Sequence, residues 1–185
     1  MKNSDRQLSK FLSYVLRHNP GSIGIELDSA GWTEIDTLLL RANADGSRMS
    51  RHDLERIVRE SEKQRFHISD DGERIRANQG HSVAVDLELT PKSPPETLHH
   101  GTVSRFLDSI RTHGLLRGQR HHVHLSAEKE TATQVGARRG KPVVLQVRSH
   151  AMSVAGYEFF LSDNGVWLTE HVPPQYLIFP PSPPD

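Results

Sequence analysis

The sequence predicts an α+β protein that is divided into two lobes, and three observations support this. Apolar residues at helical spacing dominate the first third of the chain, and a short β-hairpin pattern follows them. A proline-rich polar segment, LELTPKSPPET, then interrupts the pattern at residues 87–97. Beyond it, strand and helix patterns alternate. The length of 185 residues suits one ordinary domain or two small lobes.

The composition is that of a globular protein without thiol chemistry. Lysine plus arginine and aspartate plus glutamate number 23 each, so nucleic-acid affinity would require a local cluster of positive groups. The chain has no cysteine, which excludes disulfides, thiolate zinc sites and a cysteine nucleophile. It shows no long apolar run and no signal-peptide pattern, so we expect a cytoplasmic protein. We also expect a monomer, because no apolar stripe is left over.

The first helix is predicted within residues 8–18, LSKFLSYVLRH, where the apolar residues recur at helical spacing. Asn19 and Pro20 end it, because the residue before a proline is driven out of the helical conformation. Arg17 and His18 therefore stand side by side at the end of this helix. They either decorate a solvated helix end or point at an anion.

The second helix is predicted within GWTEIDTLLLRANA, with Thr33 as its N-cap and Asp36 in a capping-box-like position. The third is predicted within SRHDLERIVRES, where Ser50 caps the helix and Asp53 lies three residues on. Two alternating runs, KQRFHIS and ERIRANQ, surround the turn DDG and predict a β-hairpin. Helices followed by a hairpin indicate a winged-helix-like lobe.

The second lobe is predicted to mix short strands and helices. Its elements, in order, are a strand TLHHGT, a helix SRFLDSIRTHGL, a strand HHVHLS, a helix EKETATQVGARRG, a buried strand PVVLQVRS and a hairpin YEFFLS-DNG-VWLTE. Ser104 is the expected cap of the first helix of this lobe, and Gly114 its end. The predicted domains are residues 1–88, a linker 89–96, a second lobe 97–180 and a tail 181–185.

Histidine is abundant, with 12 residues, and five of them cluster in the second lobe: His99, His100, His121, His122 and His124. His122 and His124 would lie on one face of a strand, which could suit a metal. Neutral metal sites usually add a carboxylate or thiolate in register, and none is evident in the sequence. We therefore expect no metal, and favour polar, structural or ligand-binding roles.

The segment HHGT admits two interpretations. In the first, the strand ends at His100 and Gly101 lets a ligand approach the backbone. The hydroxyls of Thr102 and Ser104, together with the free N–H groups at the start of a helix, then bind a phosphate. In the second, the segment is an ordinary strand-to-helix turn with a serine cap. Local sequence alone favours the second interpretation, because serine caps are common.

Three arginines are candidates for anion binding: Arg17, Arg65 on the first hairpin strand and Arg120 before HHVHLS. Arginine is always charged, and its planar fork matches phosphate oxygens. Taken singly, each is more typical of a solvated surface residue. Neither composition nor spacing shows that they converge.

The combination of motifs is more specific than its parts. KFLSYVLRHNP, GWTEIDTLL, KQRF, IRANQGHS, HHGT, HHVHLS, VGARRGKPVVL and NGVWLT together resemble the RNA 2′-phosphotransferase family. These are the NAD-dependent enzymes that remove the 2′-phosphate left at a tRNA splice junction. The resemblance runs in order from about residue 7 to residue 178. It implies an N-terminal winged-helix RNA-binding lobe and a C-terminal lobe like the ADP-ribosyltransferases.

The resemblance also implies site residues. The essential residues of the family correspond here to Arg17, His18, Arg65 and Arg120. The NAD contacts correspond to His100, Gly101, Thr102, Ser104, His124 and Ser126. Where the family often has an aromatic residue before HGT, this chain has His99.

A reaction follows from the resemblance. The RNA 2′-phosphate attacks C1″ of the NAD ribose and expels nicotinamide, giving an ADP-ribosylated RNA 2′-phosphate; O2″ then attacks the phosphorus. The products are 2′-OH RNA and ADP-ribose 1″,2″-cyclic phosphate. The alternatives are an ADP-ribosyltransferase acting on terminal phosphates of nucleic acids or on proteins, and a non-enzymatic winged-helix binder. The neutral charge and the size of the second lobe count against the binder.

Overall fold

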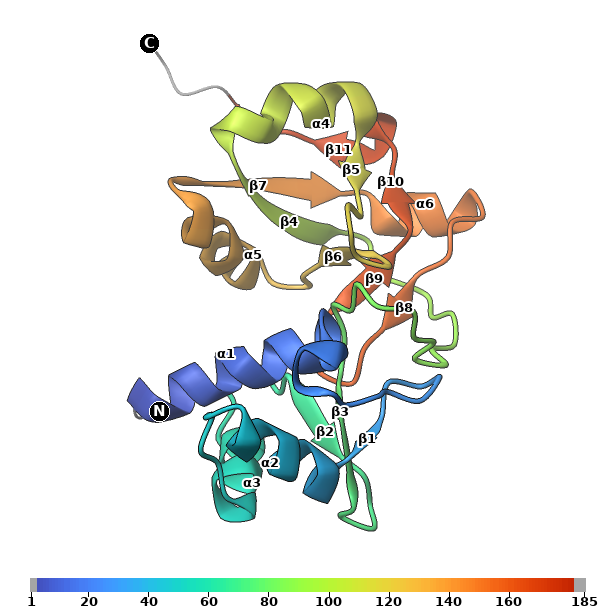
Figure 1. The fold of residues 1–185 in the computed structure, drawn as a ribbon. Coiled ribbons are helices and arrows are strands. Elements are labelled where there is room, and N and C mark those ends of the chain that lie inside the picture. The colour runs from blue at the N-terminus through green and yellow to red at the C-terminus, as the bar shows by residue number, and fades with distance from the viewer. Residues whose placement is uncertain (1–2, 182–185) are drawn as a thin grey trace. The chain divides into compact units, whose positions relative to one another are not determined.

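The computed structural model describes residues 3–181 and confirms the α+β class (Figure 1). Contacts within the chain divide it between Glu88 and Leu89 into two compact units, called here the N-terminal and C-terminal units. Most of the predicted tail, residues 182–185, lies outside the described residues. In the part that is described, no helix is both long enough and apolar enough to cross a bilayer.

The N-terminal unit combines helices with a small antiparallel sheet in the order β1-β3-β2. Its elements are α1 (Asn3–Arg17), η1 (Pro20–Ile23), β1 (Thr33–Glu34), α2 (Ile35–Ala44), α3 (Arg51–Arg59), β2 (Phe66–Ile68) and β3 (Arg74–Ala77). The predicted apolar face of α1 forms the centre of the core, since Leu12, Val15 and Leu16 are fully buried. The helix ends at Arg17, close to the predicted proline stop.

Helix α3 begins as predicted from its capping box. The Ser50 side chain accepts from the Asp53 N–H, and the Asp53 carboxylate accepts from the Ser50 N–H. Hydrogen bonds from Ser50 hold the pKa of Asp53 at about 2, below its usual 3.8. Arg56 on the next turn reaches the buried carboxylate of Asp5 at 2.8 Å and so ties α3 to α1.

The predicted cap of the second helix is wrong. Thr33 does not cap α2; it lies in β1 and pairs with Ile75 of β3. The helix begins two residues later, and the N–H of Ile35 donates to the carbonyl oxygen of Glu73 instead of to a side chain. A hydrogen bond to the hairpin therefore satisfies the first N–H group of the helix, a role that the local sequence assigned to Thr33 and Asp36.

The C-terminal unit is built on antiparallel sheets in the orders β11-β7-β4, β6-β9-β8 and β10-β5. Its strands are β4 (Leu98–Val103), β5 (Leu115–Leu116), β6 (Val123–Leu125), β7 (Pro142–Val147), β8 (Phe160–Leu161), β9 (Trp167–Thr169), β10 (His171–Val172) and β11 (Leu177–Ile178). Its helices are η2 (Ser104–Phe106), α4 (Leu107–His113), α5 (Lys129–Gly136), η3 (Ala137–Arg139), α6 (Ser149–Val154) and η4 (Pro174–Tyr176). The longest pairing joins β4 to β7, and α5 lies beside it (Figure 1).

The predicted helix after HHGT differs in its start. Ser104 is not a cap: it is the first residue of the 3₁₀ turn η2, and neither η2 nor α4 has a side-chain cap. The helix ends as predicted at Gly114, which has a φ of +75°. The segment LELTPKSPPET has no helix, but Pro91 bridges Phe160 and the Lys92 N–H donates to the Phe159 carbonyl at 2.7 Å.

Two glycines allow the backbone of α5 to touch β4. A Cβ on Gly101 would lie 1.8 Å from the carbonyl oxygen of Ala132, and one on Gly136 would lie 2.8 Å from that of Thr102. Both distances are far below contact, so only glycine fits on either side of this approach. The missing side chain of Gly101 thus makes room for a helix, where the first interpretation of HHGT assigned that room to a ligand.

We predict that Gly101→Ala destabilises the C-terminal unit by about 3 kcal/mol, because the clash is with backbone atoms that cannot rotate away. Gly21→Ala is the control, since its φ is ordinary and its added Cβ would meet nothing nearer than 3.9 Å. Denaturant unfolding of both variants measures the difference. Equal stability of Gly101→Ala and the wild type would show that β4 and α5 do not pack this closely.

Candidate functional site

The predicted site residues fall into two groups, one in each unit. Arg17, His18 and Arg65 lie in the N-terminal unit, at the end of α1 and just before β2. Arg120 and the predicted NAD contacts lie in the C-terminal unit, on or beside β4 and β6.

In the N-terminal unit, Arg17 and Arg65 are joined directly. Arg17 Nη2 donates to the carbonyl oxygen of Arg65 at 3.3 Å, and the same oxygen accepts from the N–H of Asn78 at 3.0 Å. The Arg17 guanidinium also lies over the ring of Phe66, 6.0 Å from its centroid. These contacts fix the helix end against the start of β2, so two of the predicted phosphate-binding arginines share one location.

The side chain of Arg65 turns back along α1. Its Nη1 lies 3.4 Å from Oγ of Ser9, which is buried, and the arginine itself is half-buried. The Arg65 carbonyl therefore binds the end of α1 at Arg17, and its guanidinium binds the same helix at Ser9.

His18 stands next to this pair and is exposed. Its Nδ1 lies 2.9 Å from the hydroxyl of Ser82, whose N–H donates to the Arg17 carbonyl, also at 2.9 Å. The chain that leaves the hairpin thus returns to the end of α1 and orients the imidazole. The structure brings Arg17, His18 and Arg65 together, as the sequence could not show.

In the C-terminal unit, His100 of β4 is held by β6. Its Nδ1 lies 3.1 Å from the carbonyl oxygen of His124. A carbonyl only accepts, so Nδ1 carries the proton and Nε2 of the neutral ring is an acceptor. Burial lowers the pKa of His100, and the charges of Arg139 and Arg120 lower it further. His100 is suited to accept a hydrogen bond from a hydroxyl.

His124 and Arg120 form the adjacent contact. Arg120 Nη1 lies 3.3 Å from Nδ1 of His124. A guanidinium only donates, so this ring nitrogen accepts. Just past the end of β6, the backbone of Ser126 exchanges hydrogen bonds with that of His99 at 2.8 and 2.9 Å. Backbone pairing therefore places the HHGT and HVHLS motifs side by side.

The remaining predicted contacts differ in exposure. Thr102 is buried, whereas Ser104 is exposed at the start of η2. Helix α4 has too few residues for a strong N-terminal dipole. The structure therefore gives less support for phosphate binding at this helix start than for phosphate binding by the cations around His100.

Sequence analysis missed two cations, Arg138 and Arg139. Burial lowers the pKa of Arg120, and the charges of Arg139 and Arg138 lower it as well. The Arg139 guanidinium also lies 5.9 Å from the centroid of Phe106. The two adjacent arginines are visible in the motif VGARRGKPVVL. Only the packing of α5 against β4, however, shows where the following turn η3 places their side chains.

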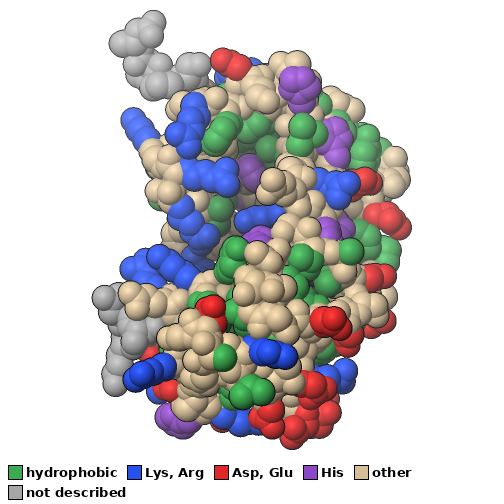
Figure 2. Space-filling model, viewed as in Figure 1, with side chains coloured by type: hydrophobic (Ala, Val, Ile, Leu, Met, Phe, Trp, Pro, Cys, Tyr) green, Lys and Arg blue, Asp and Glu red, His purple; other side chains and the backbone are tan. Residues whose placement is uncertain are grey.

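Figure 2 shows lysine and arginine side chains gathered over the side of the C-terminal unit formed by α5. The positive charges of Arg139 and Arg138 disfavour the charged form of Arg120, and a bound anion relieves that repulsion. With neutral His100 as an acceptor beside them, the group can bind a phosphorylated ligand that carries hydroxyls.

The predicted histidine face on HHVHLS is not formed as a pair. β6 begins at Val123, and the ring of His122 packs against that of Phe160 with a centroid distance of 5.5 Å. Burial lowers the pKa of His122, and the nearby positive charges of His121 and Arg117 lower it further. Within residues 3–181, no cluster of three metal-binding side chains occurs.

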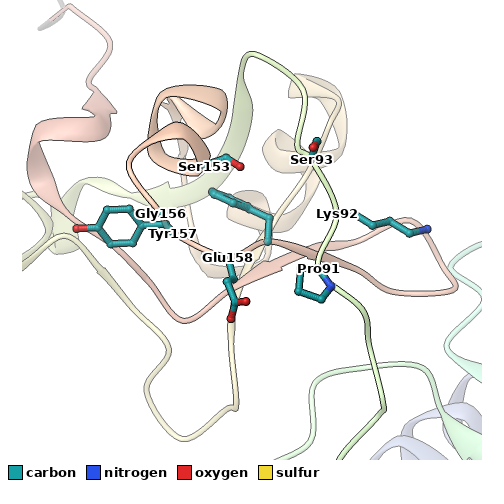
Figure 3. A pocket seen from close by; sticks show the side chains of 8 residues that line it. Pro91, Lys92, Ser93, Ser153, Gly156, Tyr157 and Glu158 are labelled. Atoms are coloured by element: carbon teal, nitrogen blue, oxygen red, sulfur yellow. The ribbon is translucent and has the colours of Figure 1, made fainter.

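A separate pocket of about 260 Å³ lies between the segment before β4 and the end of α6 (Figure 3). Its lining includes Lys92, Ser153, Tyr157 and Glu158. It contains no predicted site residue, and its charges are mixed. The pocket therefore adds nothing to the anion site around Arg120.

The chain matches known proteins over nearly its full length. A family model described as RNA 2′-phosphotransferase, Tpt1 / KptA family, matches residues 3–171. A probable RNA 2′-phosphotransferase of Rhodopirellula baltica is 54% identical over 181 residues, which cover 96% of this chain and 98% of that protein. Similar proteins with the same description from Agrobacterium fabrum and Hahella chejuensis are 56% and 54% identical over 169 residues, which cover 91% of each chain.

We predict that His100 is neutral at pH 7 with its proton on Nδ1, and that it titrates below the ordinary value of 6.5. The unfolded chain takes up this proton at a higher pH, so acidification below 6.5 lowers the free energy of unfolding. Nitrogen-15 NMR of the imidazole, assigned with His100→Gln, measures both tautomer and pKa. A ring protonated on Nε2, or charged at pH 7, would contradict the assignment.

Proposed function

The chain belongs to the RNA 2′-phosphotransferase family, and from that premise we propose that it transfers an internal 2′-phosphate of RNA to NAD. NAD is a co-substrate: it supplies the ribose carbon C1″, and nicotinamide leaves as the C1″–N bond breaks. The phosphate then passes to O2″, and the RNA oxygen takes up a proton to become a 2′-OH. The other product is ADP-ribose 1″,2″-cyclic phosphate. A tRNA-like RNA is the proposed substrate.

One observation supports NAD as the co-substrate: the neutral ring of His100 lies near the positive charges of Arg139 and Arg120, and Arg120 also lies near that of Arg138. The pKa of Arg120 is lowered by burial and by the charges of Arg139 and Arg138, so a bound anion would stabilise this group of arginines. The diphosphate of NAD offers that anion, and its ribose hydroxyls offer donors to Nε2 of His100. We propose His100, Gly101, Thr102, Ser104, His124 and Ser126 as the residues nearest to NAD, with Arg138 and Arg139 added.

Arg17, His18 and Arg65 are proposed to hold the RNA 2′-phosphate. Arg17 and Arg65 are fixed to each other through the Arg65 carbonyl, and His18 is oriented by Ser82. Such preorganised donors stabilise phosphoryl charge at little reorganisation cost. Arg120, in the C-terminal unit, is proposed as a further catalytic residue that contacts a phosphoryl group. A phosphate is already ionised near neutral pH, so it needs positioning more than it needs a general base.

We also propose finer fold assignments. In the N-terminal unit, α1, α2 and α3 followed by the β2-β3 hairpin support a winged-helix-like RNA-binding lobe. In the C-terminal unit, the antiparallel sheets with α5 beside β4 support an ADP-ribosyltransferase-like lobe. These assignments give each unit one substrate, RNA for the first and NAD for the second.

We predict that the protein, incubated with NAD and RNA carrying an internal 2′-phosphate, releases nicotinamide and ADP-ribose 1″,2″-cyclic phosphate and leaves 2′-OH RNA. Arg120→Ala is expected to lower the turnover about 10²–10³-fold, because it removes a charged contact to the phosphoryl group. Chromatography of the nucleotides and electrophoresis of the RNA measure these products.

The control is Arg148→Ala, which removes an exposed arginine of the same unit and should leave turnover unchanged. Retention of the 2′-phosphate with NAD present would refute the proposed transfer. A stable ADP-ribosylated RNA end or protein would instead identify an ADP-ribosyltransferase that acts on terminal phosphates or proteins. Near-normal turnover of Arg120→Ala would remove that residue from the site.

A further inference from the structure

The hairpin β2-β3 leads into a short segment, residues 78–82, that returns to the end of α1. The segment is the last part of the motif IRANQGHS, and it forms neither helix nor strand. Gly80 has a φ of +87°, a conformation that other residues rarely adopt, so the chain can turn there. His81 is buried, which fixes the middle of the segment. The residues at its two ends, Asn78 and Ser82, form hydrogen bonds with residues proposed to bind phosphate.

Asn78 holds the chain immediately before β2. Its N–H donates to the carbonyl oxygen of Arg65 at 3.0 Å, and its side-chain Nδ2 donates to that of Gln64 at 2.6 Å. Gln64 has a φ of +38°, which is uncommon for a residue with a Cβ and costs conformational energy. The buried Asn78 therefore stabilises the strained turn from which the Arg65 side chain departs.

Ser82 holds the end of α1 in two ways. Its N–H donates to the carbonyl oxygen of Arg17 at 2.9 Å, and its hydroxyl lies 2.9 Å from Nδ1 of His18. The Arg17 guanidinium donates in turn to the Arg65 carbonyl, which also accepts from Asn78. The hydrogen bonds thus run from one end of the segment, through the cluster of arginines and histidine, to the other end.

The hydroxyl of Ser82 suits a histidine that changes its charge. A serine hydroxyl can both donate and accept, whereas a carbonyl only accepts and an ammonium only donates. The contact with Nδ1 of His18 is therefore retained whether this nitrogen carries a proton or not. Because both residues are exposed, the hydrogen bond adds only modestly to stability, and its main effect is to fix the direction of the imidazole.

We propose that Asn78 and Ser82 are positioning residues for the phosphate site of the N-terminal unit. They hold Arg65, Arg17 and His18 in one fixed arrangement, and Ser82 keeps the imidazole in place in both of its charge states. The inference rests on the proposed function, in which these three residues bind the RNA 2′-phosphate. Groups that are in place before the substrate binds stabilise phosphoryl charge with little reorganisation, so loss of either contact should slow the reaction.

The first test uses His18 as the reporter and needs neither RNA nor NAD. The Nδ1 resonance of His18, assigned by nitrogen-15 NMR with His18→Gln, is followed while inorganic phosphate is added. Ser82→Ala should shift this resonance in the free protein and raise the Kd for phosphate about fivefold, the effect of one lost hydrogen bond. Ser82→Thr keeps a hydroxyl and should behave as the wild type does.

Ser22→Ala is the matched control. Ser22 is also an exposed serine near the end of α1, but its hydroxyl donates to the carbonyl oxygen of Asn19 at 2.7 Å instead of contacting the cluster. Its removal should change neither the His18 resonance nor the Kd. Denaturant unfolding of the two alanine variants should give equal free energies, which separates a change of position from a loss of folding.

The second test measures turnover of RNA carrying an internal 2′-phosphate at saturating NAD. Misplacement of a catalytic group by about 1 Å can cost about 10²-fold in rate. Ser82→Ala should lower kcat less than this, about tenfold, because the backbone bond to Arg17 remains, and Ser82→Thr should restore it. Asn78→Ala should lower kcat by a similar factor, and its unfolding is measured alongside because Asn78 is buried.

An unchanged His18 resonance in Ser82→Ala, an unchanged kcat, or no response of the wild-type His18 to phosphate would each overturn the inference. Failure of Ser82→Thr to restore the wild-type values would overturn it too. A wild-type protein that binds phosphate at His18 but leaves the RNA 2′-phosphate in place would instead fault the proposed function. The effect of Ser82 on phosphate binding would then stand as a property of a protein with another activity.

Discussion

The backbone of α5 lies directly against Gly101 of β4, and this contact positions the turn that carries Arg138 and Arg139. Gly136, which touches Thr102 from the other side, is the last residue of α5. The next turn, η3, carries Arg138 and Arg139. A looser approach would move both arginines away from His100 and Arg120. The two glycines thus convert a packing constraint into a local concentration of positive charge, which favours an anionic ligand.

The N-terminal unit reaches a similar result by different means. Its arginines are held by hydrogen bonds instead of by close helix packing. The Arg17 guanidinium donates to the Arg65 carbonyl, the Arg65 guanidinium donates to the Ser9 hydroxyl, and the Ser82 N–H donates to the Arg17 carbonyl. The buried apolar face of α1 anchors the helix whose end carries Arg17 and His18. The pair at the end of FLSYVLRHNP is therefore part of an ordered cluster and more than a solvated helix end.

Local signals predicted the parts of the fold that local interactions determine. The capping box of Ser50 and Asp53 and the hairpin around DDG were confirmed, because each is completed within a few residues. Thr33 and Ser104 were wrongly predicted as caps, since β1 pairing and a 3₁₀ turn replace the expected cap bonds. The short elements α6, β5, β10 and β11 were missed because each has few residues and depends on distant partners.

The site was predicted in its residue types but not in its geometry. The sequence indicated arginines and histidines, while the grouping of Arg17 with Arg65 required contacts across 48 positions. That Arg138 and Arg139 lie near Arg120 follows only from the packing of η3 against β4. The motif HHGT also changed meaning, because the space beside Gly101 is filled by α5.

The most direct test of the central claim, that this cation cluster binds NAD, is titration calorimetry with NAD. We expect saturable binding that weakens at least about tenfold in Arg139→Gln, the loss of one charge-assisted contact. Arg105→Gln, which also removes an arginine from the ring of Phe106, should bind NAD as the wild type does. No binding of NAD to the wild type, or equal affinity in Arg139→Gln, would contradict the account.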